Sequence, residues 1–263
     1  RGEAMGLIGI MNNLGLMAGN AFSSLITNEI GMQSLFWLSG IIAFVSVAIV
    51  FRMKETLPTP LPMKLEFLQV GWNDVWDSRA KEPAIVMLLT VTLFGTVITL
   101  IPDYSTSLGV MNKGLFLSIA TVATIYVRLF HSKLSDQKGR IYSCKIGTFF
   151  WLFTAILLMF RDLYAFYAAA VFCGIASGIN SPALFAWAVD VANGKKAGRA
   201  MATLFIALEL GITIGAFASA RIYNNVFANF YYVFLFVAIL MVGALFYLFL
   251  GVKKTNKKLD LST

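Results

Sequence analysis

Glu209 is the only charged residue in the run of residues 200–220, where its neighbours are Leu208 and Leu210. Carboxyl groups within apolar helices usually face a bundle interior or a water-filled cavity, and they mark ion or proton pathways. Three roles are open for Glu209. It carries a coupled proton, it binds a cationic or polar substrate, or it forms a structural hydrogen bond to a neighbouring helix.

The segment CGIASGINSPALFAW, residues 173–187, carries a second set of polar groups. Pro182 removes a backbone hydrogen bond within a helix, and spans interrupted by glycine and proline are typical of binding sites in membrane transporters. A simple packing kink is the alternative explanation. We take Asn180, Ser181, Trp187 and Tyr126 as candidates for lining a substrate cavity, and Pro182 as a hinge.

A charged segment, SKLSDQKGR, lies between two apolar runs at residues 132–140. Asp136 precedes the helix expected to begin near Arg140, and a carboxylate there can cap the free N–H groups of a helix N-terminus. Gly139 permits a tight turn. An ordinary charged loop is the alternative. Asp190 and Arg199 flank the next loop on the same side of the membrane.

The elements that position these residues follow from composition. The chain is 59% hydrophobic and 13% charged, about half the charged share of a soluble domain. Spans of about 20 apolar residues are expected within residues 3–29, 29–52, 82–103, 113–130, 146–160, 163–189, 200–220 and 230–252. Lipid-exposed irregular backbone is not tolerated, so we expect an all-α membrane protein with eight transmembrane helices.

The basic residues predict the orientation of these helices. Of the 21 lysines and arginines, all but Lys113, Arg161 and Arg221 fall on the side that holds Arg1. The positive-inside rule makes that side cytoplasmic. The net charge of +8 is therefore explained by membrane orientation, and no nucleic-acid partner is expected.

An internal repeat links the two ends of the chain. EAMGLIGIMNNLGLMAG (3–19) aligns without gaps with RAMATLFIALELGITIG (199–215). Such repeats indicate two related six-helix halves, although chance similarity between apolar helices is an alternative. The alignment places Asn13 on Glu209, and we expect both to face one cavity. It also places Gly15 and Gly19 on Gly211 and Gly215, small residues that suit close helix packing.

With these features the chain resembles the major facilitator superfamily of secondary transporters. SKLSDQKGR is similar to the family's loop signature G-x-L-x-D-x-x-G-R, with Leu134, Asp136, Gly139 and Arg140 matching and Ser132 replacing the first glycine. Arg128 before the motif, RGEAMG at 1–6 and SPALFAWAVD at 181–190 resemble drug and metabolite exporters. The proline of the family's antiporter motif is absent from residues 18–23.

The resemblance implies a partial chain of a twelve-helix, two-bundle fold, which begins at the family's fifth helix. Residues 1–52 would be the last two helices of the N-terminal bundle, 53–82 a cytoplasmic linker, 83–252 the C-terminal six-helix bundle and 253–263 a cytoplasmic tail. Leu134, Asp136, Gly139 and Arg140 would form a cytoplasmic gate that Asp190 and Arg199 join. A monomer in a bacterial inner membrane is expected.

The expected function is proton-coupled efflux of small molecules by alternating access, with the lipid bilayer, a small-molecule substrate and protons as partners. An importer of sugars or organic metabolites and a nonfunctional truncated fragment are the alternatives. An enzyme is not expected, because His131 is the only histidine and the acids are scattered. No cofactor or metal site is expected, since the two cysteines suggest neither a metal site nor a disulfide framework.

Overall fold

The computed structural model describes residues 29–52, 75–131, 138–192 and 197–252, together with single residues outside these ranges. Within them the chain forms helices joined by short turns, and no strand. The helices are α2 (Met32–Phe51), η2 (Ser78–Ala80), α4 (Lys81–Ser107), α5 (Leu115–His131), α7 (Arg140–Met159), α8 (Leu163–Val191), α9 (Ala197–Tyr223), η3 (Phe227–Asn229), α10 (Phe230–Phe246) and η4 (Tyr247–Gly251).

Six of these segments are long and apolar enough to cross a membrane. They are Met32–Phe51, Ser78–Ser107, Arg140–Met159, Leu163–Val191, Ala197–Tyr223 and Phe227–Gly251. The expectation of an all-α membrane protein is confirmed. α5 has 17 residues, which is short of the about 20 that a span requires. The expected span in residues 3–29 lies largely outside the described residues, so the count of eight is not reached.

α4 extends further than the sequence predicted. The expected span ends at Asp103, but the helix continues through Pro102 to Ser107. Proline leaves the carbonyl oxygen four positions before it, that of Ile98, without its helical N–H partner, which transmembrane helices tolerate. The Thr106 hydroxyl donates to the carbonyl oxygen of Pro102 over 3.0 Å, and the fully buried Tyr104 holds the last turn against the bundle. α8 likewise remains one helix through Pro182.

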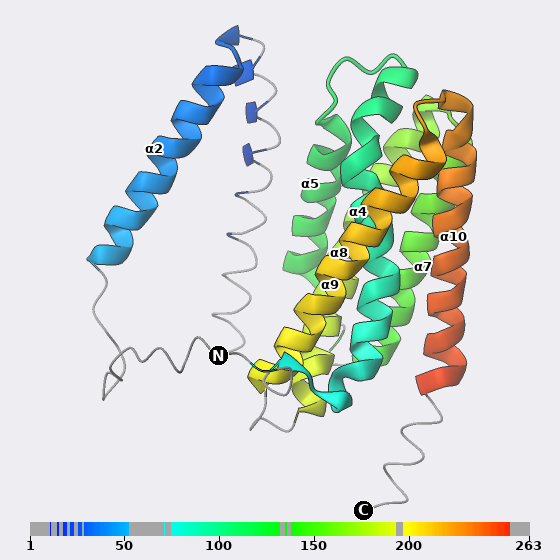
Figure 1. Cartoon of the computed structure of the whole chain (residues 1–263). Helices are drawn as coiled ribbons and strands as arrows, with labels where there is room; N and C mark the ends of the chain where they lie inside the picture. Colours follow the sequence, from blue (N-terminus) through cyan, green and yellow to red (C-terminus); the bar gives the residue numbers. More distant parts are fainter. Residues whose placement is uncertain are drawn as a thin grey trace, which may run out of the picture.

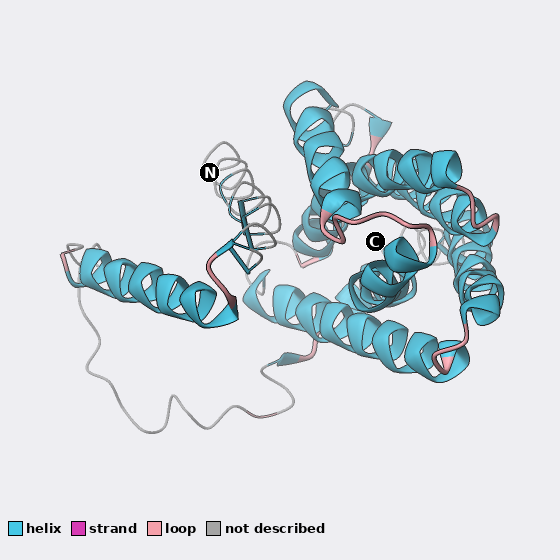
Figure 2. Cartoon of the chain, turned by 90° about the horizontal axis from the view of Figure 1, so that it is seen from above, coloured by secondary structure: helices cyan, strands magenta, loops and turns pink. Residues whose placement is uncertain are grey.

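Six helices form one bundle, from which α2 stands apart in both views (Figures 1 and 2). In the bundle α4 lies along α9, α8 lies between α5 and α7, and α10 closes the group against α7 and α4. α2 buries none of its residues. A helix that is apolar on every side is typical of a membrane span, so α2 fits a segment surrounded by lipid or by other helices.

Glycines bring the paired helices close together. A β-carbon on Gly215 would overlap the carbonyl oxygen of Thr92, and one on Gly211 would lie 2.7 Å from the carbonyl oxygen of Leu88. The α5–α8 pair repeats this arrangement, since a β-carbon on Gly174 would overlap the carbonyl oxygen of Ala120. Small residues allow such backbone approach in membranes, and these contacts fix the spacing of the helices that carry the candidate site.

The core has two main parts. The larger surrounds Tyr104, whose ring lies 4.9 Å from that of Phe230 and 5.4 Å from that of Phe234, centroid to centroid. The other packs α8 against α4 and α9 nearer the end that holds η2. Cys144 and Cys173 are free thiols, both buried between helices.

Tyr104→Phe tests the polar contact that the Tyr104 hydroxyl makes within the aromatic core. The Tyr104 hydroxyl donates to the carbonyl oxygen of Leu158 over 2.7 Å. Because this bond is buried, its removal is expected to lower the free energy of unfolding by about 1 kcal/mol. Thermal unfolding of the purified protein in detergent measures the change. Tyr167→Phe, at a half-buried tyrosine on α8, is the control, and an equal loss in both variants would contradict the prediction.

The segment that leads into α4 is fixed to the first turns of α9. The Asp77 N–H donates to the Thr203 hydroxyl oxygen over 2.8 Å, and the Thr203 hydroxyl donates to the carbonyl oxygen of Val75 over 2.9 Å. The Asp77 carboxylate caps η2 by accepting from the Arg79 N–H. These bonds hold the end of the expected linker beside the first turns of α9. Residues 53–70 of that linker lie outside the described chain.

Candidate functional site

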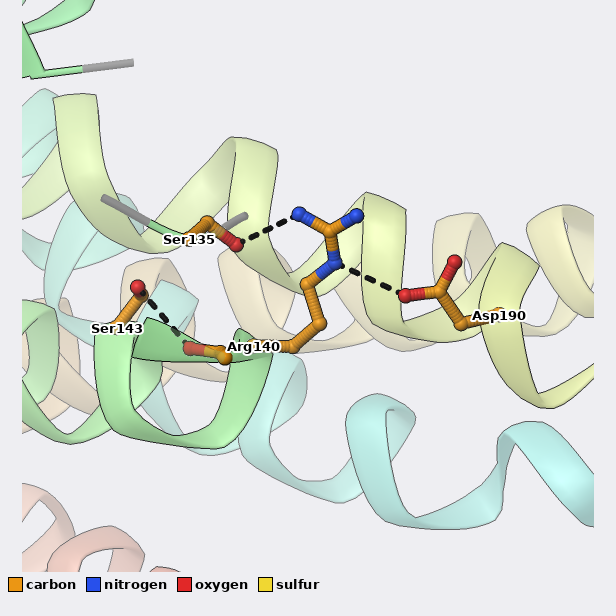
Figure 3. Close-up of polar contacts among 5 residues, drawn as sticks. Ser135, Arg140, Ser143 and Asp190 are labelled. Carbon is orange, nitrogen blue, oxygen red and sulfur yellow. Dashed lines mark hydrogen bonds and ion pairs between the residues drawn. The ribbon is translucent and has the colours of Figure 1, made fainter. Parts of the chain in front are cut away.

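A charge cluster lies where α7 begins and α8 ends. Arg140 Nε donates to Asp190 Oδ2 over 2.9 Å, and the same guanidinium donates to the Ser135 hydroxyl over 3.0 Å (Figure 3). The side chain of Arg140 is 27% exposed and that of Asp190 is 54% exposed. The pair therefore joins two helix ends at the surface of the bundle, where water still reaches both groups.

Local backbone geometry aims Arg140 at this partner. Gly139 has a φ of +91°, a conformation that glycine adopts at little cost, and α7 begins at the next residue. The Ser143 hydroxyl donates to the carbonyl oxygen of Gly139 over 3.3 Å (Figure 3). Gly139 thus turns the chain sharply into α7, as the loop sequence suggested.

Other members of the predicted gate are only partly placed. Leu134 and Asp136 lie outside the described residues. Arg199 lies in the first turn of α9 and is half-buried. In the described part of the chain, Asp190 is paired with Arg140 and no ion pair joins it to Arg199. The sequence proposed a network that includes Arg199, and among the described members of the gate the structure joins Arg140 to Asp190 and also to Ser135.

The substitution Asp190→Asn tests whether the Arg140–Asp190 pair is needed for transport or only stabilises the fold. An exposed ion pair contributes about 0–1 kcal/mol to stability, so the melting temperature is expected to change little. The transport rate is expected to fall, because the neutral amide no longer holds the end of α8 against Arg140. Proteoliposome flux and thermal unfolding measure the two effects, and exchanging the charges (Arg140→Asp with Asp190→Arg) is expected to restore part of the rate. An unchanged rate in Asp190→Asn would contradict the role.

Glu209 lies in the middle of α9, on the side opposite the helix that α9 packs against. Leu204, Ala207, Gly211 and Gly215 are buried and define the α4-facing side. Glu209 is two residues from Gly211, which turns it about 200° around the helix, and it is exposed. Ten residues separate it from Arg199, a depth of about 15 Å. The carboxyl group therefore points out of the described bundle near the centre of the membrane.

An aromatic contact between α8 and α9 shows which residue of α8 lies at the same membrane depth as Glu209. The rings of Phe185 and Phe205 are 5.3 Å apart, and α8 and α9 run in opposite directions. One helical turn further from the charge cluster, Ser181 on α8 and Glu209 on α9 are therefore at equal depth. Two more hydroxyls, Ser177 and Thr213, follow one turn beyond. The i, i+4 spacing of these polar residues on each helix was the signal in the sequence that could have revealed them.

The other candidates occupy different surroundings. Asn180 is 2% exposed against Gly147 of α7, and its Oδ1 atom has no hydrogen-bond partner. Trp187 is buried in the core, whereas Tyr126 is 58% exposed on α5 beside the ring of Phe130. Ser181 is half-buried and Pro182 is exposed. Asn13 lies outside the described residues, and Gly15 and Gly19 have open space around them.

No group of three histidine, cysteine or acidic side chains is close enough to hold a metal ion in the part of the chain that is described. What the geometry offers is an acid and several hydroxyls at mid-membrane depth and an ion pair at one membrane face. These groups can bind a polar solute or a proton and can respond to movement of the helix ends.

Comparison with known proteins places these features in a family. The sequence profile of the Major Facilitator Superfamily matches residues 1–160 and residues 111–263, which together cover the chain. The chain belongs to this superfamily. Major facilitator proteins are multi-pass membrane transporters, so family membership confirms the expected class of protein and argues against an enzyme.

One curated relative bears on the direction of transport. The staphylopine export protein of Staphylococcus aureus is 30% identical over 138 residues, which are 50% of this chain and 34% of that protein. The matched part therefore spans about a third of the relative. An export protein among the relatives of this major facilitator chain agrees with the exporter-like resemblance of its sequence.

Proposed function

We propose that this chain is part of a secondary transporter that exports small molecules in exchange for protons. The observation that carries the proposal is the position of Glu209, half-way along α9 and turned away from the α4-facing glycines. An acid that faced lipid at this depth would cost on the order of 3 kcal/mol on insertion scales. The face that holds Glu209 is therefore the one turned towards a water-filled path.

The neighbouring side chains suit a polar solute. Ser181 is level with Glu209, and Thr213 continues the polar face of α9 one turn further. The Thr213 hydroxyl already donates to the carbonyl oxygen of Glu209 over 2.8 Å, so Thr213 offers a solute mainly its acceptor lone pair. A substrate with N–H or cationic groups fits a wall made of a carboxylate and hydroxyl oxygens.

Coupling requires that the bundle respond when Glu209 gains or loses a proton. In alternating access, one bundle rocks against the other about a site at the membrane midplane. The Arg140–Asp190 pair joins the ends of α7 and α8 at one face, and the Phe185–Phe205 contact lies between that face and Glu209. Both contacts lie within one bundle, and we assign them to holding its helix ends together as it rocks.

A flux assay tests the proposal. The protein is reconstituted in vesicles that contain a pH-sensitive dye, and a panel of cationic and zwitterionic metabolites and drugs is added at an imposed proton gradient. Substrate-dependent proton movement opposite to substrate movement supports exchange. Substrate movement in the same direction as the protons would replace export with import, and substrate movement without any proton flux would remove the coupling.

A further inference from the structure

A groove lies between α7 and α10. These two helices are on the side of the bundle away from α2 (Figure 1). Its volume is about 410 Å³. Leu152, Ile156 and Met159 form the α7 wall, and Leu235, Ile239 and Val242 form the α10 wall. Every lining side chain is apolar, so the groove has no affinity for water or for a polar solute.

The groove exists because the side chain at its floor is small. Ala238 is 8% exposed, whereas Ile239 beside it is 61% exposed and Val242 is 54% exposed. From Leu235 to Val242 the groove extends about 10 Å along α10, within a hydrocarbon layer of about 30 Å. α7 ends at Met159 and α10 begins at Phe230, so the groove lies in the half of the membrane next to these helix ends.

Two polar residues lie near the ends of the helices that line the groove. Arg161 follows α7 directly, in a turn where its φ is +51°, and it is exposed. Tyr231 is one helical turn before Leu235 and is 46% exposed. The carboxylate beside Arg161, that of Asp162, caps α8 by accepting from the Ala165 N–H over 3.0 Å. Among the described residues no carboxylate lies within ion-pair distance of Arg161.

We propose that this groove is a specific phospholipid site, with one acyl chain between α7 and α10 and the lipid phosphate bound by Arg161. The occupant must combine an apolar chain of the length of the groove with a negative charge at one end, and a membrane phospholipid does so. Arginine binds phosphate through paired N–H donors, and tyrosine is enriched at this level of the membrane. The site is independent of the proposed transport function.

Lipid titration of the purified protein tests the site. After delipidation in detergent, dioleoylphosphatidylglycerol is added, and binding is followed by native mass spectrometry and by the rise in melting temperature. Arg161→Gln, which removes the cation, and Ala238→Phe, which fills the floor, are each expected to weaken binding at least tenfold. Ile239→Trp blocks the exposed rim without changing the core, should Ala238→Phe fail to fold. Dioleoylglycerol, with the same chains and no phosphate, is expected to bind at least tenfold more weakly than the phospholipid.

Matched controls make the result specific. Arg221→Gln removes another exposed arginine on the same side, and Val171→Phe enlarges an exposed residue on α8; both are expected to bind lipid as the wild type does. Undiminished binding in Arg161→Gln, or equal binding of dioleoylglycerol, would overturn the site. A wild-type dimer that Ile239→Trp dissociates, seen by light scattering, would overturn it in favour of a second copy on this face.

Discussion

Glu209→Gln is expected to abolish substrate-dependent proton flux while leaving substrate exchange intact. Glutamine has the shape and hydrogen bonding of the protonated acid but cannot release a proton. Glu209 is exposed on the side of α9 opposite Gly211, so the substitution removes no packing contact in the described bundle. Proton flux in dye-loaded proteoliposomes and exchange of labelled substrate at equal pH measure the two activities separately.

The three roles of Glu209 predict different results in these two assays. Loss of flux with retained exchange supports proton carriage. Loss of both activities, together with weaker substrate binding, assigns the carboxylate to the substrate. Full activity in both assays would make Glu209 a structural residue and would contradict the proposed coupling. Asp103→Asn, at an exposed acid near the end of α4, is the control and is expected to retain both activities.

Gly215→Val is expected to destabilise the bundle by about 3 kcal/mol, the upper part of the usual cost of overpacking. A β-carbon at this position would overlap the carbonyl oxygen of Thr92, and the neighbouring N–H of Thr96 would lie 3.0 Å away. Backbone atoms cannot move aside as a flexible side chain does, so α9 must shift from α4. The shift also removes the hydrogen bond from the Thr96 hydroxyl to the carbonyl oxygen of Gly215.

Gly243→Val is the matched control for this substitution. Gly243 lies inside α10 and is exposed, and a β-carbon added to it would have no atom of a neighbouring helix within 4 Å. The change in helix propensity is the same at both sites, so the difference between the two variants isolates the contact with α4. Thermal unfolding in detergent and the yield of folded protein measure it. Equal behaviour of the two variants would show that α4 and α9 are not in close contact at Gly215.

Most of the helices were predictable from the sequence because their uncharged runs have about the length that the membrane requires, although the runs at 113–130 and 146–160 are shorter. The ends of the helices were less predictable. Asp103 marked the end of a span in the sequence, yet α4 continues to Ser107 because the buried Tyr104 and the Thr106 hydroxyl stabilise the last turn. Only tertiary packing provides these contacts, and hydropathy does not record them.

The candidate site was predictable in part for a similar reason. An acid within an apolar run identifies Glu209 from sequence alone, and a glycine before Arg140 predicts the turn into α7. The depth match between Ser181 and Glu209 depends on how α8 and α9 meet at Phe185 and Phe205. Burial of Trp187 and Asn180 depends on which side of α8 faces α7, and Gly147 decides this by admitting Asn180.

Because both native thiols are buried, conformational changes of this protein can be followed by labelling introduced cysteines. Cys144 is 0% exposed and Cys173 is 3% exposed, and the sequence contains no other cysteine. Water-soluble maleimides will not reach either sulfur in the folded protein, so the unmodified chain already serves as an unreactive background. Single cysteines placed one by one along the exposed side of α9 would then report directly, by their labelling rates with and without substrate, which positions water reaches.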